Sequence, residues 1–342
     1  MIGIRGIRGI VAGSGLLLLA SLPALAAQAQ TDDAALAPLP ECAPEAGRVP
    51  VVQGIRVEEV PTLEGDLPRL RVSAPQEAFM YVYHDAASEP VARSWAACLG
   101  TQLALAMYLL QDDRTGAEWQ SVVFSRDADY ALPRGDDVVT RWLVHTGESL
   151  EHRSDLVETL LSTLPHEQVH EFQGREGGGR PRWLSEGHAS WMGHRITRII
   201  APARAADLRS GQLRDLRPDE DIDLAGWGFP QPRREALMRQ VSEADRARME
   251  EDPSFVPKGS YSFGPDDFES DESQTDARYA AAWLVFEKLE AQYGFERVSA
   301  WATRLTATSD FLINDAVARS LEEEFGEDLY ALLGETQRHA IR

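Results

Sequence analysis

Apolar and polar residues alternate along three short stretches of the chain, and this spacing predicts β-strands. The stretches are residues 79–84, 119–124 and 138–144, and each is rich in valine or aromatic side chains. Alternation of this kind places one set of side chains on a buried face of a sheet and the other set on the opposite face. Segments rich in Asp, Gly and Pro separate the second and third stretches, as expected between strands.

Apolar residues recur at helical spacing in several longer stretches. Pro165 ends one of them, and because proline lacks a backbone N–H we expect it to kink the chain or to begin the next helix afresh. Gly294 follows another and is expected to end that helix. On their own, the strands and helices predict a lobe that mixes both. The predicted helices cover residues 91–110, 156–164, 183–200, 278–293, 311–318 and 326–341.

Residues 1–29 have the pattern of an export signal. Arg5 and Arg8 precede an apolar run from Ile10 to about Leu25, and small residues follow at the expected cleavage positions. The alternative is an uncleaved membrane anchor, but the run is short for a span and its small-residue end favours cleavage. We therefore expect an exported protein, periplasmic or extracellular, with no membrane association after the signal is cleaved.

Residues 30–76 are rich in Ala, Pro and acidic side chains, which predicts an N-terminal extension or linker before a domain at residues 77–342. The extension holds Cys42, and the only other cysteine is Cys98. In an oxidising compartment the two could form a disulfide. A buried Cys98 beside an unpaired Cys42 is the alternative, and the sequence does not separate the two.

The chain is long enough for a substantial core and is strongly acidic. It has 342 residues, of which 43% are hydrophobic, and a formal net charge of −21. Such a charge argues against nucleic acid and anionic membrane surfaces as partners. The negative charge is explained sufficiently if it keeps an exported protein soluble. The sequence leaves the oligomeric state open.

The most informative chemistry lies in the segment L-P-H-E-Q-V-H, residues 164–170. In an α-helix, His166 and His170 stand one above the other on a single face, as two imidazole nitrogens must to bind one Zn²⁺. Glu167 is rotated from that line by roughly 100°, so it is poorly placed as a ligand but can reach a water on the metal as a general base. The alternative is a solvated helix that carries these residues by chance.

The residues that follow argue against chance. A glycine-rich break and Pro181 separate this helix from the next apolar stretch, which predicts a helix–turn–helix. Such a hairpin folds Glu186 back toward His166 and His170. It would complete a site of two histidines and one glutamate, with a fourth position left for water.

Three other polar residues lie on the second helix and could have a role at the metal. His188 lies two positions from Glu186, so it should point to a different face of the helix and be a packed or exposed histidine. The alternative is a role as an extra metal ligand or a substrate contact. Ser190, one turn beyond Glu186, could hydrogen-bond to a ligand, although a helical serine more often bonds backbone or water. His194 is expected to be structural.

The H-E-x-x-H pattern followed by W-L-x-E-G-x-A at residues 183–189 resembles the gluzincin clan of zinc metallopeptidases, which includes thermolysin-like and peptidase MA-like enzymes. The resemblance implies an α+β zincin (thermolysin-like) fold, with a small mixed β-sheet N-terminal lobe, an active-site helix and a helical C-terminal lobe. It implies one Zn²⁺ per chain, Glu186 as the third ligand and Glu167 as the base. The resemblance extends from about residue 77 to the C-terminus, and its most specific part is residues 166–189.

Tyr279 opens the predicted helix 278–293 and is followed by A-A-A-W-L-V-F. This resembles the tyrosine-led helix of gluzincin aminopeptidases and peptidase MA-like proteins. The resemblance implies that the Tyr279 hydroxyl stabilises the oxyanion, a task that suits a donor that is neutral at pH 7. A tyrosine that packs at a helix start is the alternative.

Residues 201–276 differ from the rest of the chain because they alternate basic and acidic clusters. Charge of this kind is typical of a solvated insertion. Because the segment lies between the third ligand and Tyr279, a lid or substrate rim is the alternative. Its glycine–aromatic segments, residues 226–230 and 259–264, would then supply contacts.

These features together predict an exported zinc-dependent peptidase that acts on peptide or protein substrates. The G-x-M-x-N element of gluzincin aminopeptidases is absent from the preceding strands, which favours endopeptidase over aminopeptidase action. One rival is a non-catalytic zinc-binding protein on a zincin scaffold that acts as an envelope binding or assembly factor. Its usual signature is loss of the base, and Glu167 is present. The other rival is an envelope protein whose motif is accidental.

Overall fold

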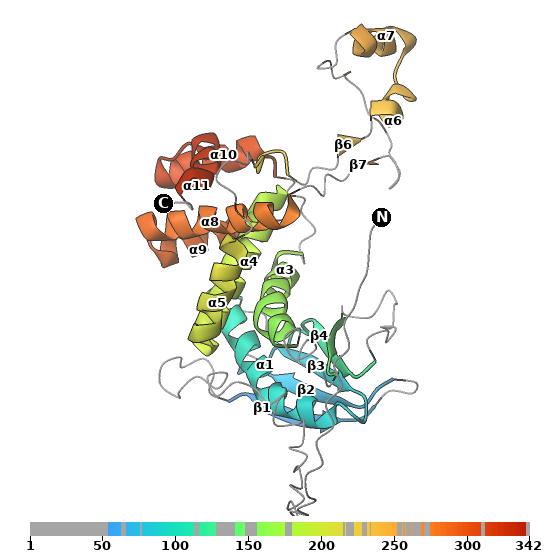
Figure 1. Cartoon of the computed structure of the whole chain (residues 1–342), viewed down its shortest axis with the longest axis vertical. Helices are drawn as coiled ribbons and strands as arrows, with labels where there is room; N and C mark the ends of the chain where they lie inside the picture. The colour runs from blue at the N-terminus through green and yellow to red at the C-terminus, as the bar shows by residue number, and fades with distance from the viewer. Residues whose placement is uncertain are drawn as a thin grey trace, which may run out of the picture.

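The protein belongs to the α+β class, and its computed structural model combines a five-stranded mixed sheet with a larger set of helices (Figure 1). The structure describes residues 54–62, 66–75, 77–112, 116–127, 141–147, 156–174, 180–214, 216, 222–227, 231–232, 234–251, 255, 257, 261, 268–269, 274–308 and 312–339. The expected export signal at residues 1–29 lies outside these residues and stays a prediction.

The strands are β1 (Arg56–Val60), β2 (Arg69–Ser73), β3 (Phe79–His84), β4 (Ser121–Ser125), β5 (Arg141–His145), β6 (Gln231–Pro232) and β7 (Phe268–Glu269). The helices are α1 (Glu89–Leu109), the π-helix η4 (Thr159–Thr163), α3 (Leu164–Gly174), α4 (Arg182–Ile200), α5 (Pro202–Leu213), α6 (Arg234–Met238), α7 (Glu243–Glu251), α8 (Thr275–Tyr293), α9 (Phe295–Thr306), α10 (Asn314–Phe325) and α11 (Leu329–His339).

The five-stranded sheet has the order β1-β2-β3-β4-β5. β1, β2 and β3 pair antiparallel, whereas β3, β4 and β5 pair parallel. Leu70 lies opposite Val82, which in turn lies opposite Val122, so three buried aliphatic side chains form a row across one face. Helix α1 covers this face closely: a Cβ on its Gly100 would lie 3.0 Å from Val72 Cγ1.

The sequence predicted the later strands of this sheet but not the first two. The expected strand at residues 79–84 is β3, and those at 119–124 and 138–144 correspond to β4 and β5 with shifted ends. β1 and β2 lie within residues 30–76, where we expected an extension, so the sheet begins before residue 77. The side chains of β1 are mostly exposed, and β2 turns Arg69 and Arg71 onto the aromatic rings of Tyr81 and Phe79. Their polar composition concealed both strands.

Helix α4 lies between α3 and α8 and contacts both (Figure 1). Residues 186, 190, 193 and 197 of α4 are spaced three or four apart, so they share the face that meets the η4–α3 segment. A Cβ on Gly193 would lie 2.8 Å from the backbone nitrogen of His166, and one on Gly187 would lie 2.6 Å from the carbonyl oxygen of Ala282 in α8. Glycine at these two positions therefore permits α4 to approach both neighbours.

Pro165 neither breaks nor restarts the helix, because a π-helical turn precedes it. The N–H of Leu164 donates to the carbonyl of Thr159, five residues back. Pro165 has no N–H to donate into this turn, and side chains from other helices donate to two of its carbonyls. Gln102 Nε2 donates to Leu160 O at 2.6 Å, and the Thr197 hydroxyl donates to Leu161 O. The carbonyls of Leu160 and Leu161, in the turn that precedes the H-E-x-x-H segment, are thus satisfied.

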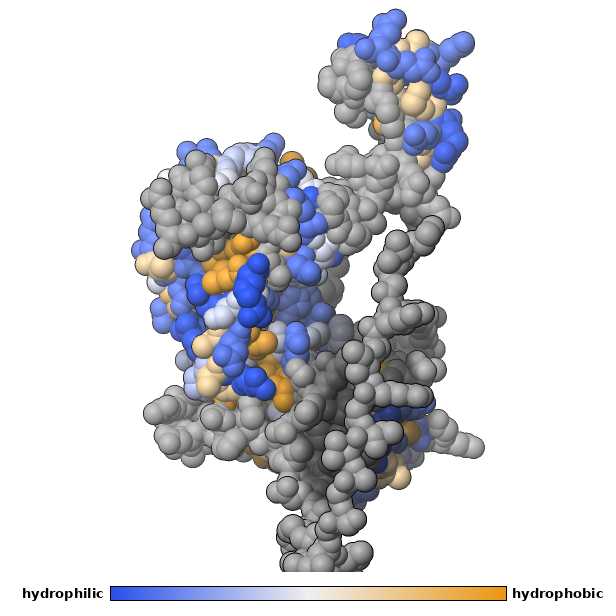
Figure 2. All heavy atoms as spheres, in the orientation of Figure 1, coloured by the Kyte–Doolittle hydropathy of each residue, from blue (hydrophilic) through white to orange (hydrophobic). Residues whose placement is uncertain are grey.

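Residues 201–276 divide into two parts. Helix α5 contacts α4 and α8 and belongs to the body of the molecule. Helices α6 and α7 and the two-stranded β6–β7 sheet lie apart from that body (Figure 1), and the described surface there is largely hydrophilic (Figure 2). Of the glycine–aromatic segments, the structure describes Gly226, Trp227 and Tyr261.

The C-terminal helices partly match their prediction. Helix α8 agrees with the expected helix 278–293, and Gly294 follows it with φ of 83°, a conformation that favours glycine. Helix α9 was missed, whereas α10 and α11 begin about three residues later than expected. No helix in the described part of the chain is long and apolar enough to span a bilayer. Cys98 is disulfide-bonded, and Cys42 lies outside the described residues.

Replacing Gly193 with Ala should lower the free energy of unfolding by about 1–3 kcal/mol, because the new methyl group overlaps the backbone of His166. Denaturant unfolding with a chelator present measures this without a metal contribution. The matched control is Gly334→Ala in α11, where the space is open and alanine should stabilise by up to about 1 kcal/mol. Equal effects at both positions would contradict the close approach of α3 and α4.

Candidate metal centre

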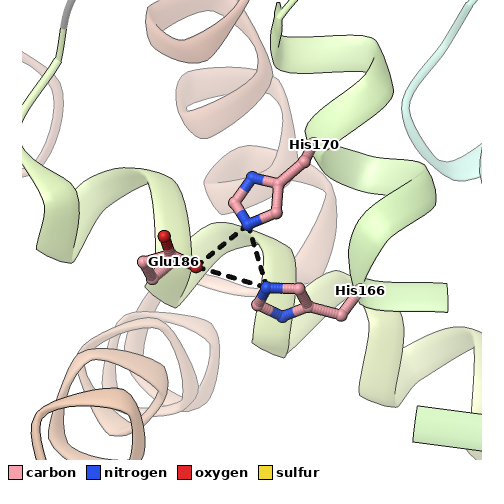
Figure 3. Close-up of side chains that lie close together, drawn as sticks. All are labelled: His166, His170 and Glu186. Atoms are coloured by element: carbon pink, nitrogen blue, oxygen red, sulfur yellow. Dashed lines mark hydrogen bonds and ion pairs between the residues drawn. The ribbon is translucent and has the colours of Figure 1, made fainter. Parts of the chain in front are cut away.

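Helix α3 presents His166 and His170 one turn apart on the face that meets α4, as the H-E-x-x-H spacing predicts (Figure 3). Their ring centroids are 4.6 Å apart with an interplanar angle of 78°. The two Nε2 atoms lie 2.9 Å from each other. Both rings therefore point their Nε2 atoms at the same position.

Helix α4 supplies the third member of this cluster, Glu186. Its Oε2 lies 2.9 Å from His170 Nε2 and 3.2 Å from His166 Nε2 (Figure 3). The other oxygen, Oε1, lies 3.7 Å from Arg182 Nε. The structure thus brings together the three residues that the sequence singled out as ligands.

The charges of the cluster are strongly coupled. Burial would raise the pKa of the Glu186 carboxyl, but hydrogen bonds and positive charge from both histidines outweigh burial and hold its pKa well below the usual value. Burial would likewise lower the pKa of His170, yet the hydrogen bond and negative charge of Glu186 raise it. The carboxyl is therefore an anion at neutral pH, ready to bind a cation.

The donor set fits a divalent metal ion, and zinc in particular. One side-chain nitrogen from each of His166 and His170 and one carboxylate oxygen of Glu186 all lie within 4.8 Å of one another. In a tetrahedral zinc site with bonds of about 2.0–2.1 Å, ligand atoms lie roughly 3.3 Å apart. The separations of 2.9–3.2 Å observed here are shorter by a few tenths of an ångström, which small side-chain rotations can supply. These three residues could hold one ion.

Glu167 lies beside this cluster rather than in it. Its side chain is half-buried. Burial raises the pKa of the Glu167 carboxyl, and the charge of Glu186 raises it further, although both histidines act in the opposite direction. A carboxyl with a raised pKa next to a metal position is suited to accept a proton.

Tyr279 also lies next to the cluster, from helix α8. Its ring centroid is 6.1 Å from that of His166, and Trp227 packs edge-on against it at 5.1 Å. The Arg182 guanidinium lies over the Trp227 ring, 5.0 Å from its centroid. Burial, together with the charge of Glu186, raises the pKa of the Tyr279 phenol. Tyr279 thus stays protonated and able to donate a hydrogen bond.

The sides of the imidazole rings that face away from the cluster are hydrogen-bonded. Ser190 Oγ lies 3.2 Å from His166 Nδ1, the contact considered for it from the sequence. Gln173 Oε1 lies 2.9 Å from His170 Nδ1. Both histidines therefore have a partner that orients the ring, as the histidine ligands of many metal sites do.

The two histidines of α4, His188 and His194, lie outside the cluster. His188 is fully buried and its Nδ1 lies 3.0 Å from Gln173 Nε2, which does not support the alternative role as an extra ligand. Complete burial lowers the pKa of His188 to about 3. His194 Nε2 donates to the carbonyl of Ala205 at 2.9 Å, in keeping with its expected structural role.

Sequence reasoning missed two residues close to the site, Gln173 and Arg182, and named Trp227 only within a glycine–aromatic segment that could form a substrate rim. Gln173 follows His170 by three positions and Arg182 precedes Glu186 by four, so helical spacing alone places each on the face of its ligand. That signal was present in the sequence. Trp227 comes from a distant segment, and only the fold brings it next to Tyr279.

A cavity of about 400 Å³ lies between η4 and α5. Glu158, Arg204, Asp207 and Arg214 are among its lining residues. A smaller cavity of about 30 Å³ shares part of this lining and reaches His166 on the side of Ser190. The region behind His166 is therefore hollow and partly polar.

A comparison with protein-family models finds no match, and a comparison with curated proteins finds none either. Among solved structures, the chain is similar to the M1 zinc metallopeptidase from Deinococcus radiodurans. The identity is 12% with that enzyme, 11% with a variant and 10% with the variant bound to a Tyr-Ser-Ala substrate, each with a TM-score of 0.37. Each alignment covers 84% of this chain and 52% of the other, so the chain spans about half the length of the structures it matches.

We expect the purified protein to bind one divalent ion per chain, and zinc best, because two imidazoles and one carboxylate favour zinc. His170→Ala and Glu186→Ala should each lose the ion or bind it much more weakly. Elemental mass spectrometry after loading and desalting measures the content. At a free zinc concentration about 100 times the dissociation constant, the unmodified protein should gain about 2.7 kcal/mol in unfolding free energy.

The matched control is His145→Ala, which removes a histidine of β5 outside the cluster. This variant should keep the metal content of the unmodified protein. No zinc in the unmodified protein after loading would refute the site. Equal loss in the control would show that the variants act through folding.

Proposed function

We propose that this protein is an exported zinc-dependent peptidase with a zincin-like fold. The observation that carries the proposal is the convergence of His166, His170 and Glu186 within 4.8 Å, with Glu167 on the same helix turn as the two histidines. The α+β architecture and the helical hairpin of α3 and α4 support the fold assignment. Export rests on the pattern of residues 1–29 alone.

His166, His170 and Glu186 would hold the zinc ion. When bound, zinc supplies Lewis acidity to a water molecule and to the carbonyl of the scissile bond. The ring partners Ser190 and Gln173 hold the two imidazoles so that their Nε2 atoms face the ion.

Glu167 acts as the general base and then as the general acid. Its carboxylate takes a proton from the attacking water and later delivers that proton to the leaving amine nitrogen. Because Glu167 is not one of the three residues that would hold the metal ion, its carboxylate remains free for proton transfer. The raised pKa of its carboxyl supports the first half of this exchange, in which the carboxylate accepts the proton.

Tyr279 stabilises the carbonyl oxygen as negative charge develops on it. Its raised phenol pKa keeps the proton in place, so the hydroxyl donates a hydrogen bond without carrying charge. Trp227 and Arg182, which pack around it, limit the positions the ring can take. The position of Tyr279 next to His166, and the effect of the Glu186 charge on its phenol pKa, support the oxyanion role over simple packing at a helix start.

Replacing Glu167 with Gln should leave zinc binding intact but abolish hydrolysis, because the amide cannot accept the proton. The measurement is mass-spectrometric detection of cleavage products from a peptide mixture, at equal zinc content. Glu171→Gln, one turn further along α3, is the matched control and should cleave like the unmodified protein. Equal cleavage by Glu167→Gln would exclude Glu167 as the base.

The same peptide mixture tests the subclass if half of it carries acetylated N-termini. An endopeptidase cleaves blocked and free peptides alike, whereas an aminopeptidase needs the free amine. We propose the endopeptidase, because the sequence lacks the G-x-M-x-N element. A zinc-loaded protein that cleaves no peptide would instead favour the non-catalytic binding or assembly role.

Replacing Tyr279 with Phe should lower kcat by about 10²–10³-fold with little change in KM or zinc content, because one oxyanion donor is lost. Steady-state kinetics on a peptide from the screen measures both constants. Tyr293→Phe, at the other end of α8, is the matched control and should retain kcat. An unchanged kcat in Tyr279→Phe would assign that tyrosine to packing.

A further inference from the structure

Gln173 lies at the centre of a buried hydrogen-bonded group behind His170. The residue is 2% exposed. Its Oε1 lies 2.9 Å from His170 Nδ1 and 2.7 Å from Ser185 Oγ. Its Nε2 lies 3.2 Å from the carbonyl oxygen of Ser185 and 3.0 Å from His188 Nδ1. An amide offers two donors and two acceptor positions, and all four are used.

The orientation of this amide follows from its partners. The backbone carbonyl of Ser185 can only accept a hydrogen bond, so the amide nitrogen of Gln173 must face it. The amide oxygen then faces His170 and can only accept, so Nδ1 of His170 must carry a proton. In the neutral ring this leaves the lone pair on Nε2, the atom that points at Glu186.

His188 completes the group from the other side. Because the amide nitrogen of Gln173 can only donate, His188 Nδ1 must accept. Thr306 Oγ1 lies 3.2 Å from the same nitrogen, but the Thr306 hydroxyl donates to the Ala302 carbonyl at 2.8 Å. The hydrogen bond to His188 Nδ1 therefore comes from Gln173.

Arg180 fixes the backbone at this point. Its Nη2 donates to the carbonyl oxygen of Gln173 at 2.9 Å, and its Nη1 donates to the carbonyl of Thr306. The guanidinium thus joins the last turn of α3 to the end of α9. Neither the backbone nor the side chain of Gln173 can shift without breaking several buried hydrogen bonds.

We propose that Gln173 and His188 are positioning residues for metal binding. Gln173 holds His170 in the tautomer whose Nε2 binds the ion. His188 holds the Gln173 amide in the orientation that places its oxygen against His170 Nδ1. This inference rests on the proposed zinc site. A hydrogen-bond partner behind a histidine ligand fixes the ring and raises its basicity, and its loss typically costs about 10–100-fold in metal affinity.

The test is zinc affinity, measured by competition with a chromophoric chelator. Gln173→Met keeps the length of the side chain but removes the amide, and we expect the zinc dissociation constant to rise about 10–100-fold. The matched control is Gln102→Met. Gln102 is equally buried and donates to Leu160 O, away from the ligands. An unchanged affinity in Gln173→Met, or an equal loss in the control, would overturn the proposal.

Two further variants separate positioning from folding. Gln173→Glu keeps an acceptor for His170 Nδ1 but loses the donor that faces the Ser185 carbonyl and His188 Nδ1, so it should recover only part of the affinity that Gln173→Met loses. His188→Phe leaves all ligands and Gln173 in place and should weaken zinc in the same direction by a smaller factor. If Gln173→Met does not fold, the zinc affinities of these two variants test the proposal instead. Affinity in Gln173→Glu no better than in Gln173→Met, or native affinity in His188→Phe, would overturn the corresponding half of the proposal.

A spectroscopic measurement reports on the hydrogen bond itself. In the zinc-loaded protein, proton–nitrogen NMR should show a His170 Nδ1 proton that exchanges slowly with water. This proton should exchange rapidly in Gln173→Met and stay slow in Gln102→Met. Rapid exchange in the unmodified protein would refute the hydrogen bond. None of these measurements uses a substrate, so a protein that binds zinc but cleaves nothing refutes the peptidase function and not the positioning role.

Discussion

The close contact between α3 and α4 is the constraint on which the site depends. Gly193 allows α4 to reach the backbone of His166, and Glu186 lies about two turns earlier on the same face. Because both helices are rigid, setting their separation at Gly193 also sets the distances between the carboxylate and the two imidazoles. A methyl group at that one position would move donor atoms that lie about 10 Å further along the helix axis.

The same contact brings together groups that are costly to hold in one place without a cation. Two imidazole nitrogens and a carboxylate oxygen lie within 3.2 Å of one another, in side chains that are mostly buried. Without a metal ion, protons must be shared among them, which is why the pKa of His170 rises and that of Glu186 falls. A divalent ion would replace those protons, so the apoprotein is expected to be the less stable form.

The sequence predicted the site better than the fold around it. The ligand spacing on α3 is local and needs only helical periodicity, and the glycine-rich break was sufficient to expect that Glu186 folds back. β1 and β2 were missed because charged side chains make up much of both strands, which are held by pairing of β1 with β2 and of β2 with β3. The π-helical turn before Pro165 was unpredictable because Gln102 and Thr197, which satisfy its freed carbonyls, lie far away in the sequence.

Trp227 shows how the charged segment 201–276 takes part in the site. The residue is only 1% exposed, and its ring is held between Tyr279 and the Arg182 guanidinium. A side chain buried in this way cannot leave its position without exposing a large apolar surface. Asn314 adds to this restraint, because its amide bonds both the carbonyl of Ala225 and the indole of Trp183. The segment around Trp227 is therefore held in place beside Tyr279. Any lid formed by residues 201–276 would have to come from another part of that segment.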